Sequence, residues 1–289
     1  MGKIKSFLSA TRPRTLPASI APVLLGSAVA VREGEFKLCA ALLCMGVALF
    51  AQIASNFAND YFDFKNGSDT PGRQGPVRMS ASGKLKAETV LYGAIGFLIA
   101  ACLCGLCLLF FAPWWIIPVG IVIAICVFAY SAGPYPLSRH ALGDITVLVF
   151  YGLVPVILTC FVQSGNISFE TVLLGTATGL LSVNILIVNN YRDVEEDKAC
   201  GKITTAVLWG RPTVAKIYLV DILAACIILS CISPSLPAMA VSITLMIWGI
   251  ALWRRLQHTT GCALNRLLGT TAATVSIWAL AASAIIIFS

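Results

Sequence analysis

The chain has 289 residues, of which 58% are hydrophobic and only 11% are charged, and its mean hydropathy is +0.88. This composition excludes a soluble globular domain and is typical of an integral membrane protein. We attribute the net charge of +7 to basic loops at a membrane surface and to phosphate binding, so no nucleic-acid partner is expected.

Apolar segments follow one another along the whole chain. A hydrocarbon core of roughly 30 Å needs about 20 apolar residues in each helix that crosses it. The sequence therefore predicts an all-α, polytopic membrane protein with about nine helices around a central cavity that faces the cytoplasm. The predicted spans are 15–32, 38–62, 88–111, 114–131, 142–163, 169–191, 213–231, 235–253 and 266–288.

The basic residues predict how the chain is oriented. Counted by the side of the predicted spans, all but Arg32 and Lys37 of the 20 Lys and Arg residues fall on one face. Because basic loops stay in the cytoplasm, that face and the amino terminus are predicted to be cytoplasmic, with the carboxyl terminus outside.

The first eight spans suggest an internal duplication. Spans one to four and spans five to eight each have a long polar loop after their second helix, and an Asp-rich segment opens each loop. We therefore predict one domain with two pseudo-repeated halves, about 1–131 and 142–253, and a final helix. Membrane proteins commonly place their sites where such halves meet, so the two Asp-rich segments are expected to converge on one cavity.

The first acidic segment reads N-D-Y-F-D-F-K-N-G-S-D and runs from Asn59 to Asp69. Asn56, either Asn59 or Asp60, and Asp63 recur at helical spacing, so they are predicted to project from one face of the second span. Asp69 follows in the loop, and we expect it to lie within reach of the same ion as these residues.

The second acidic segment reads N-N-Y-R-D-V-E-E-D, and Asn190, Asp193 and Asp197 share one face of the sixth span. Carboxylates at a membrane edge are costly unless they are paired or bind a metal. Mg²⁺ prefers hard oxygen ligands, and one or two carboxylates usually hold it together with a substrate phosphate. Two facing acidic segments therefore predict Mg²⁺ ions around a diphosphate.

Several other polar residues have two interpretations each. Loop Arg and Lys residues are candidates for gripping phosphate oxygens, or they are ordinary cytoplasmic loop charge. The second interpretation is weaker for Arg78 and Lys202, which follow the acidic segments closely. Asp144 is either a site carboxylate or a partner of its own helix amino terminus, and Tyr135 either bonds a substrate or marks the membrane interface.

Five stretches of the chain together resemble the UbiA superfamily of intramembrane prenyltransferases, and most closely its naphthoate branch. The spacing from Asp63 to Asp69 is similar to that branch, whereas most of the superfamily has a shorter spacing. The stretches are A-T-R-P-R-T-L-P-A (10–18), N-F-A-N-D-Y-F-D-F-K-N-G-S-D (56–69), R-Q-G-P-V-R (73–78), Y-P-L-S-R-H-A-L-G-D (135–144) and N-N-Y-R-D-V-E-E-D-K-A-C-G-K-I-T (189–204).

The resemblance implies a reaction and a location. The reaction is Mg²⁺-dependent transfer of a polyprenyl group from its diphosphate to 1,4-dihydroxy-2-naphthoate, with loss of the carboxylate as CO₂, giving demethylmenaquinone and diphosphate. The location is the bacterial cytoplasmic (inner) membrane.

Together with the resemblance, the patterns above assign roles to individual residues. Catalysis is assigned to Asp60, Asp63, Asp193 and Asp197, and Mg²⁺ binding to the same four residues with Asn59 and Asp69. Diphosphate binding is assigned to Asn56, Arg73, Arg192, Lys198 and Lys202. Acceptor binding is assigned to Arg12, Arg14, Arg78, Tyr135 and Asp144.

Two alternative functions remain at this point. A prenyltransferase of the same superfamily with another aromatic acceptor fits the same motifs. A membrane transporter of anionic solutes would also have a duplicated plan, but it would need charges on both faces, and the outer face has almost none.

Overall fold

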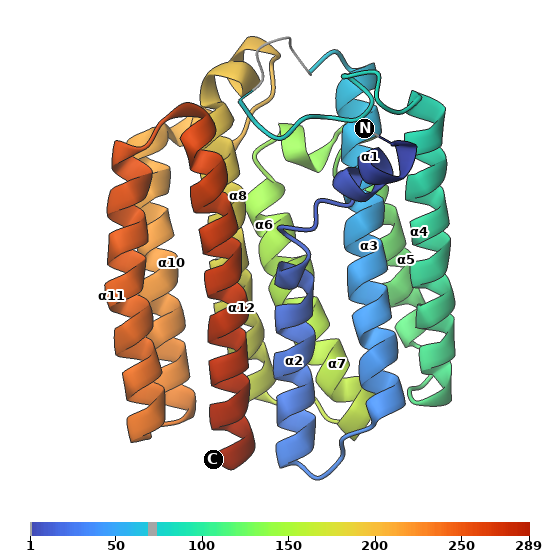
Figure 1. The fold of residues 1–289 in the computed structure, drawn as a ribbon. Helices are drawn as coiled ribbons and strands as arrows, with labels where there is room; N and C mark the ends of the chain where they lie inside the picture. Colours follow the sequence, from blue (N-terminus) through green and yellow to red (C-terminus); the bar gives the residue numbers. More distant parts are fainter. Residues whose placement is uncertain (1, 69–73) are drawn as a thin grey trace.

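A computed structural model describes residues 2–68 and 74–289. Within these ranges the chain is folded almost entirely into helices (Figure 1), with one isolated parallel β-bridge between His140 and Ile203. The predicted all-α, polytopic architecture is confirmed. Two residues predicted to serve the site, Asp69 and Arg73, lie outside the described residues.

The described part contains 7 helices that are long and apolar enough to cross a membrane. They are α3 (Leu38–Lys65), α4 with η1 (Ala87–Cys107, Leu108–Phe110), α6 with η3 and α7 (Gly143–Leu148, Val149–Leu153, Val154–Ser164), α8 (Phe169–Ala199), α10 (Arg211–Ile232), α11 (Leu236–His258) and η4 with α12 (Gly261–Ala263, Leu264–Phe288).

Two shorter apolar helices, α2 (Pro17–Arg32) and α5 (Ile116–Ala129), occupy the positions of the first and fourth predicted spans. The number of crossings therefore stays a prediction. The remaining elements are short; one precedes α2, and the others lie between α5 and α6 and between α8 and α10. They are α1 (Lys3–Ala10), η2 (Leu137–Arg139) and α9 (Thr205–Trp209).

The helices form one bundle in which α3, α4 and α5 lie at one side and α10 and α11 at the other (Figure 1). Between them, α2 packs against α12 and α7, and α8 packs against α10 and α12. The amino terminus and the loops that follow α3 and α8 lie at one end of the bundle, whereas the carboxyl terminus lies at the opposite end. The predicted odd number of crossings would require termini at opposite ends.

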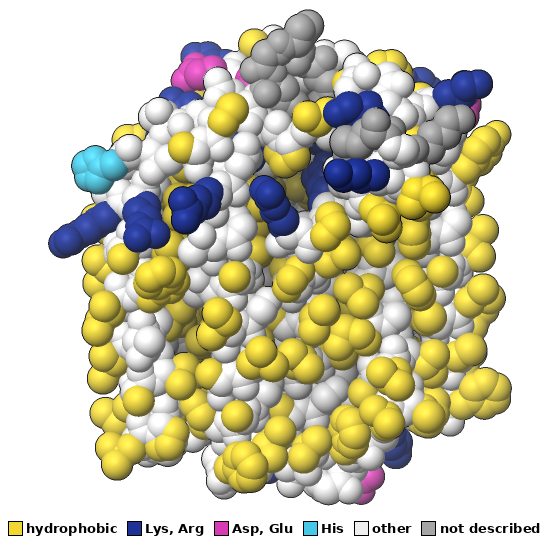
Figure 2. Space-filling model, viewed as in Figure 1, with side chains coloured by type: hydrophobic (Ala, Val, Ile, Leu, Met, Phe, Trp, Pro, Cys, Tyr) yellow, Lys and Arg dark blue, Asp and Glu magenta, His cyan; other side chains and the backbone are white. Residues whose placement is uncertain are grey.

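The surface agrees with a membrane environment. Figure 2 shows Lys and Arg side chains gathered around the end that carries the α3 and α8 loops, above a surface that is mainly apolar. At the other end, Arg32 donates to Glu170 across 2.8 Å and so joins the end of α2 to the start of α8. Basic belts of this kind flank the hydrocarbon region of membrane proteins.

The first acidic segment is helical as far as Lys65, and the second is helical throughout. The helix α3 continues beyond the predicted span to Lys65, and α8 continues to Ala199. Helical geometry then places residues three, four and seven positions apart on one face. The polar stripes predicted from spacing therefore exist as helix faces at the same end of the bundle.

Glycines bring α8 unusually close to the span formed by α6, η3 and α7. A methyl group added at Gly152, in the π-helical turn η3, would lie 2.3 Å from the carbonyl oxygen of Gly175 and 2.4 Å from Cα of Gly179. Small residues four positions apart allow helix backbones to approach in this way in membranes. This contact sets the position of the α6 side chains that line the cavity described below.

We expect Gly152→Ala to destabilise the protein, because the added methyl group overlaps backbone atoms of α8. These atoms can move away only if the whole helix shifts. Overpacking of this kind costs about 1–3 kcal/mol. The thermal unfolding midpoint in detergent should fall by several degrees. Gly96→Ala in α4 is the matched control, since nothing lies within 4 Å of a methyl group there. Equal midpoints for the two variants would contradict the packing argument.

Candidate active site

A cavity of about 1320 Å³ lies inside the bundle and is lined by residues of the helices α2 to α8 and of α12. Its lining changes character along α3. Cys44, Val47 and Ala48 line one stretch of it, whereas Asn56 and Asn59 line the stretch nearest the acidic loops. The cavity therefore has an apolar part inside the bundle and a polar end near the loops.

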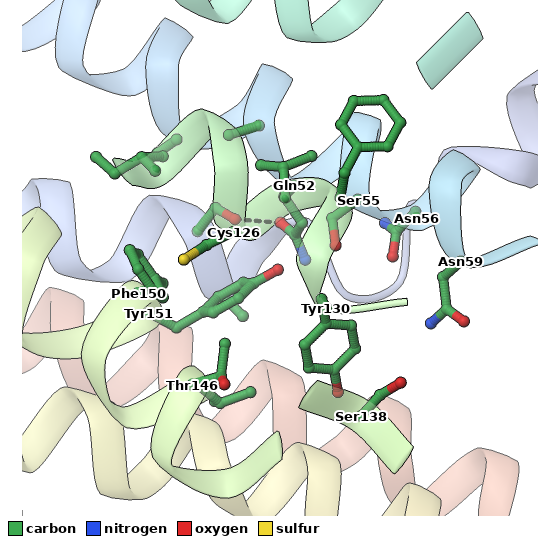
Figure 3. A pocket seen from close by; sticks show the side chains of 18 of the residues that line it. Gln52, Ser55, Asn56, Asn59, Cys126, Tyr130, Ser138, Thr146, Phe150 and Tyr151 are labelled. Atoms are coloured by element: carbon green, nitrogen blue, oxygen red, sulfur yellow. Dashed lines mark hydrogen bonds between the residues drawn. The ribbon is translucent and has the colours of Figure 1, made fainter. Parts of the chain in front are cut away.

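Polar side chains follow one face of α3 into the cavity. Figure 3 shows Gln52, Asn56 and Asn59 in a row, on the side that faces the rings of Tyr130 and Tyr151. Both tyrosines line the cavity, but the sequence analysis did not assign them to the site. Their aromatic rings next to an apolar stretch gave no signal that distinguishes them from membrane-interface residues.

Two side-chain amides of α3 also hold the segment that joins α1 to α2, together with the first turn of α2. Gln52 bonds to Ser19 and donates to the backbone oxygen of Thr15 at 3.0 Å, while Asn56 donates to the backbone oxygen of Thr11 at 3.1 Å. Between these bonds lie two cavity-lining arginines that the sequence analysis assigned to the acceptor, Arg12 and Arg14.

Asp63 forms a buried ion pair with Arg78. The guanidinium donates to the Asp63 carboxylate at 2.6 Å, and both side chains are nearly inaccessible to solvent. The same Arg78 nitrogen lies 3.4 Å from the side-chain oxygen of Asn59. Charge-assisted bonds of this length are strong, and removing one partner would leave a buried charge uncompensated.

Asp60 has different partners from Asp63. Its two carboxylate oxygens accept the backbone N–H groups of Met79, at 2.8 Å, and Ser80, at 2.9 Å. Asp60 lines the cavity. It therefore holds the chain segment next to Arg78 rather than a side chain.

The two buried carboxylates of the second acidic segment, Asp193 and Asp197, each form an ion pair. Arg192 grips the carboxylate of Asp193 with two nitrogens, at 2.6 and 2.7 Å, and Lys202 lies 3.2 Å from Asp197. Arg192 also donates to Asn189 at 2.7 Å and to Asn265 of α12 at 2.6 Å. Each buried carboxylate of this segment thus has a cation beside it.

The structure brings most predicted site residues to this cavity, and both acidic segments reach it. Asn59 and Asp60 come from α3, while Lys202 follows α8. The carboxylates of Asp63, Asp193 and Asp197 lie behind the lining in their ion pairs, and Lys198 is exposed. The predicted residues that line the cavity are Arg12, Arg14, Asn56, Asn59, Asp60, Arg78, Tyr135, Asp144 and Lys202.

The sequence analysis missed two residues that tie the loops together. Arg139 donates to Ser68 in the loop after α3 and to the backbone oxygen of Cys200 after α8, both at 2.8 Å. Asn265 donates to the backbone oxygen of Gln74 at 3.0 Å. Arg139 lies inside a stretch that resembles the UbiA superfamily, whereas Asn265 has no sequence signal at all.

The residues at the polar end suit Mg²⁺ by donor type. Among the described residues, no three His, Cys, Asp or Glu side chains form a group that could hold a metal ion. Mg²⁺ does not need such a group, because one or two carboxylates suffice when substrate phosphate and water complete its shell. Asn59 and Asp60 provide hard oxygens in the cavity lining, and Asp63, Asp193 and Asp197 provide more directly behind it, so the donor set fits.

Comparison with known proteins identifies the family. The model of the UbiA prenyltransferase family matches residues 19–269. The 1,4-dihydroxy-2-naphthoate octaprenyltransferase of Haemophilus influenzae is 35% identical over 216 residues, which cover 72% of this chain and 70% of that protein. The enzyme of the same name from Mycobacterium tuberculosis is 35% identical over 218 residues, covering 75% of this chain and 74% of that protein.

Solved structures share the fold. A UbiA homologue from Archaeoglobus fulgidus, bound to DMAPP and Mg²⁺, superposes with a TM-score of 0.68 at 14% identity, covering 97% of this chain and 99% of that one. The apo structure of a UbiA homologue from Aeropyrum pernix gives a TM-score of 0.69 at 13% identity, covering 94% and 97%. Because the family model matches residues 19–269 and relatives at 35% identity cover 72% and 75% of the chain, the protein belongs to the UbiA prenyltransferase family and is a prenyltransferase.

Proposed function

We propose that this prenyltransferase transfers a polyprenyl group from polyprenyl diphosphate to 1,4-dihydroxy-2-naphthoate, with Mg²⁺ as cofactor. The carboxylate of the acceptor leaves as CO₂, and the products are diphosphate and demethylmenaquinone in its reduced form. The observation that carries the proposal is one cavity with an apolar interior and a polar end at which both acidic segments meet. The naphthoate acceptor is supported by relatives of that activity at 35% identity.

The cavity suits a donor with two unlike ends. The isoprenoid tail lies against the apolar lining, where burial of hydrocarbon is favourable. The diphosphate lies at the polar end, where Arg78 and Lys202 are two of the cations that line the wall. The ion pairs of these two residues with Asp63 and Asp197 hold both cations in place before the substrate binds.

Bond breaking at the donor depends on charge neutralisation. Bound Mg²⁺ supplies Lewis-acid stabilisation of the leaving diphosphate. Arg78 and Lys202 add fixed positive charge where negative charge develops, and such preorganised charge is a large term in catalysis. The C–O bond breaks with its electron pair on the diphosphate, leaving an allylic cation.

The residues around the cation protect and stabilise it. The rings of Tyr130 and Tyr151 face the cavity (Figure 3), and the negative faces of aromatic rings attract cations. The apolar lining keeps water away from the cation. The carbon of the electron-rich naphthoate ring that carries the carboxylate then attacks the cation and forms the new C–C bond. The ring–carboxylate bond breaks, and its electron pair returns to the ring as CO₂ departs.

The acceptor carboxylate needs a cationic partner until it leaves. Arg12, Arg14 and Arg78 line the cavity and are the candidates for this contact. Arg12 has a backbone φ of 53°, a left-handed conformation that is uncommon for a residue other than glycine. Such backbone strain often occurs at functional positions. Tyr135 and Asp144, which also line the cavity, complete the proposed acceptor site.

The acceptor is tested by the fate of its carboxylate. Purified protein with Mg²⁺, a polyprenyl diphosphate and carboxyl-labelled 1,4-dihydroxy-2-naphthoate should release labelled CO₂ in proportion to prenylated product. Prenylated product that retains the label, or prenylation of 4-hydroxybenzoate in preference to the naphthoate, would replace this proposal with another acceptor of the same family.

Metal binding is tested at the carboxylates that have side-chain partners. Asp63→Asn, Asp193→Asn and Asp197→Asn should each lower the turnover rate about 100-fold or more, because the amide keeps the size but loses the charge. Glu195→Gln is the matched control in the same segment. Its side chain is 74% exposed and pairs with Arg211 only at the surface, where ion pairs contribute little. Wild-type rates in two of the three Asp variants would end the metal proposal.

We also propose a bacterial inner-membrane location with the polar end of the cavity in the cytoplasm, as the basic belt in Figure 2 supports. The test uses single cysteines in a variant without the native ones. A membrane-impermeant maleimide should label Asn166→Cys, in the exposed loop between α7 and α8, on intact cells. It should label Ser82→Cys only after lysis. The reverse pattern would invert the topology.

A further inference from the structure

Four carboxylates of the acidic segments are buried to a similar extent, but one of them has a different kind of hydrogen-bond partner. Asp63, Asp193 and Asp197 each pair with a cationic side chain. Asp60, which is 4% exposed, instead accepts two N–H groups from consecutive backbone positions, Met79 and Ser80. The partner of Asp60 is therefore the chain itself.

This difference matters when a metal ion arrives. A cationic side chain can rotate away from a carboxylate and leave its oxygens to the ion. Backbone N–H groups can leave only if the chain segment moves. Consecutive N–H groups that point at one anion form a small positive concavity, and Asp60 already occupies it with both oxygens.

The segment that Asp60 holds is also fixed by packing. The Met79 side chain is 2% exposed and belongs to a core cluster with Phe57, Ala58 and Leu85. The backbone of the segment turns back on itself, because Leu85 donates its N–H to the Met79 oxygen at 3.1 Å. Two features therefore fix this segment, the Asp60 carboxylate and the Met79 side chain.

Arg78 immediately precedes the two anchored residues. Its backbone position follows from theirs, and its guanidinium extends to Asp63, one helical turn from Asp60 on α3. Residues three apart lie on one face of a helix, so α3 holds this segment at two adjacent points. Asp60 holds the backbone and Asp63 holds the side chain.

We propose that Asp60 is a positioning residue, which fixes the backbone of Met79 and Ser80 so that Arg78 stands at the polar end of the cavity, and that Asp60 does not bind Mg²⁺. The proposal refines the metal set predicted from spacing and rests on the proposed function. It separates two aspartates that the sequence pattern treats alike.

The direct test is hydrogen–deuterium exchange of the segment 77–86, measured by mass spectrometry on the detergent-solubilised protein without substrate. Asp60→Asn should speed exchange of the Met79 and Ser80 amides about tenfold or more, the order expected when charge-assisted hydrogen bonds are lost. Asp63→Asn is the matched control and should leave these two amides protected. Unchanged exchange in Asp60→Asn would overturn the proposal.

The second test separates positioning from metal binding. For Asp60→Asn, the Mg²⁺ concentration that gives half-maximal turnover should stay within about twofold of wild type while kcat/KM falls, because the lost interaction is not a metal contact. For Asp63→Asn it should rise strongly. An equal rise in both variants would make Asp60 a metal ligand.

The third test follows Arg78. If Asp60 acts through Arg78, adding Asp60→Asn to an Arg78→Ala variant should lower kcat/KM only slightly further. The effects of two substitutions are not additive when the two residues act as a unit. Full additivity would overturn the proposal.

A second variant covers the case in which Asp60→Asn does not fold. Met79→Ala loosens the same segment and leaves the Asp60 carboxylate intact, so it should reproduce the fall in kcat/KM with unchanged Mg²⁺ dependence. Wild-type kcat/KM in Met79→Ala would contradict the proposal that the fixed backbone of this segment positions Arg78. If wild-type protein transfers no prenyl group to any acceptor, the proposed function fails, whereas the exchange experiment still decides the role of Asp60.

Discussion

The structure depends on the cost of burying carboxylates at the ends of apolar helices. A buried anion is tolerated only when hydrogen bonds or cations compensate its lost hydration. Asp60, Asp63, Asp193 and Asp197 are each 6% exposed or less. Their partners come from loops or from neighbouring turns of the chain, so the requirement for compensation draws the polar loops onto the helix ends.

The same constraint explains why a network of hydrogen bonds fixes the polar end of the cavity, whereas the apolar lining needs none. Arg139 joins the loops after α3 and α8, and Asn265 links Gln74 to Arg192. No comparable network is needed along the apolar lining, where side chains only exclude water. A diphosphate needs fixed charges in a defined geometry, whereas an isoprenoid tail needs only a hydrocarbon-like wall. The polar and apolar parts of the cavity therefore match the diphosphate and the isoprenoid tail of the proposed donor.

The sequence by itself determined the class of protein, the helices and the location of the polar end. In lipid every backbone group must bond within its own segment, so long apolar runs have no alternative to helices. Helical spacing then placed Asn56, either Asn59 or Asp60, and Asp63 on one face, because that relation depends only on residues within two turns. The extension of α8 through its acidic segment follows from the same local geometry.

Only the tertiary structure decided which group each of these residues contacts. Asp60 and Asp63 are equivalent in the local pattern, yet their partners Met79, Ser80 and Arg78 lie well beyond α3 in the chain. The roles of Arg139 and Asn265, and the position of Tyr151 in the cavity wall, likewise depend on segments far apart in sequence. Spacing along one helix carries no information on such contacts, because they are set by how the helices pack and where the loops return.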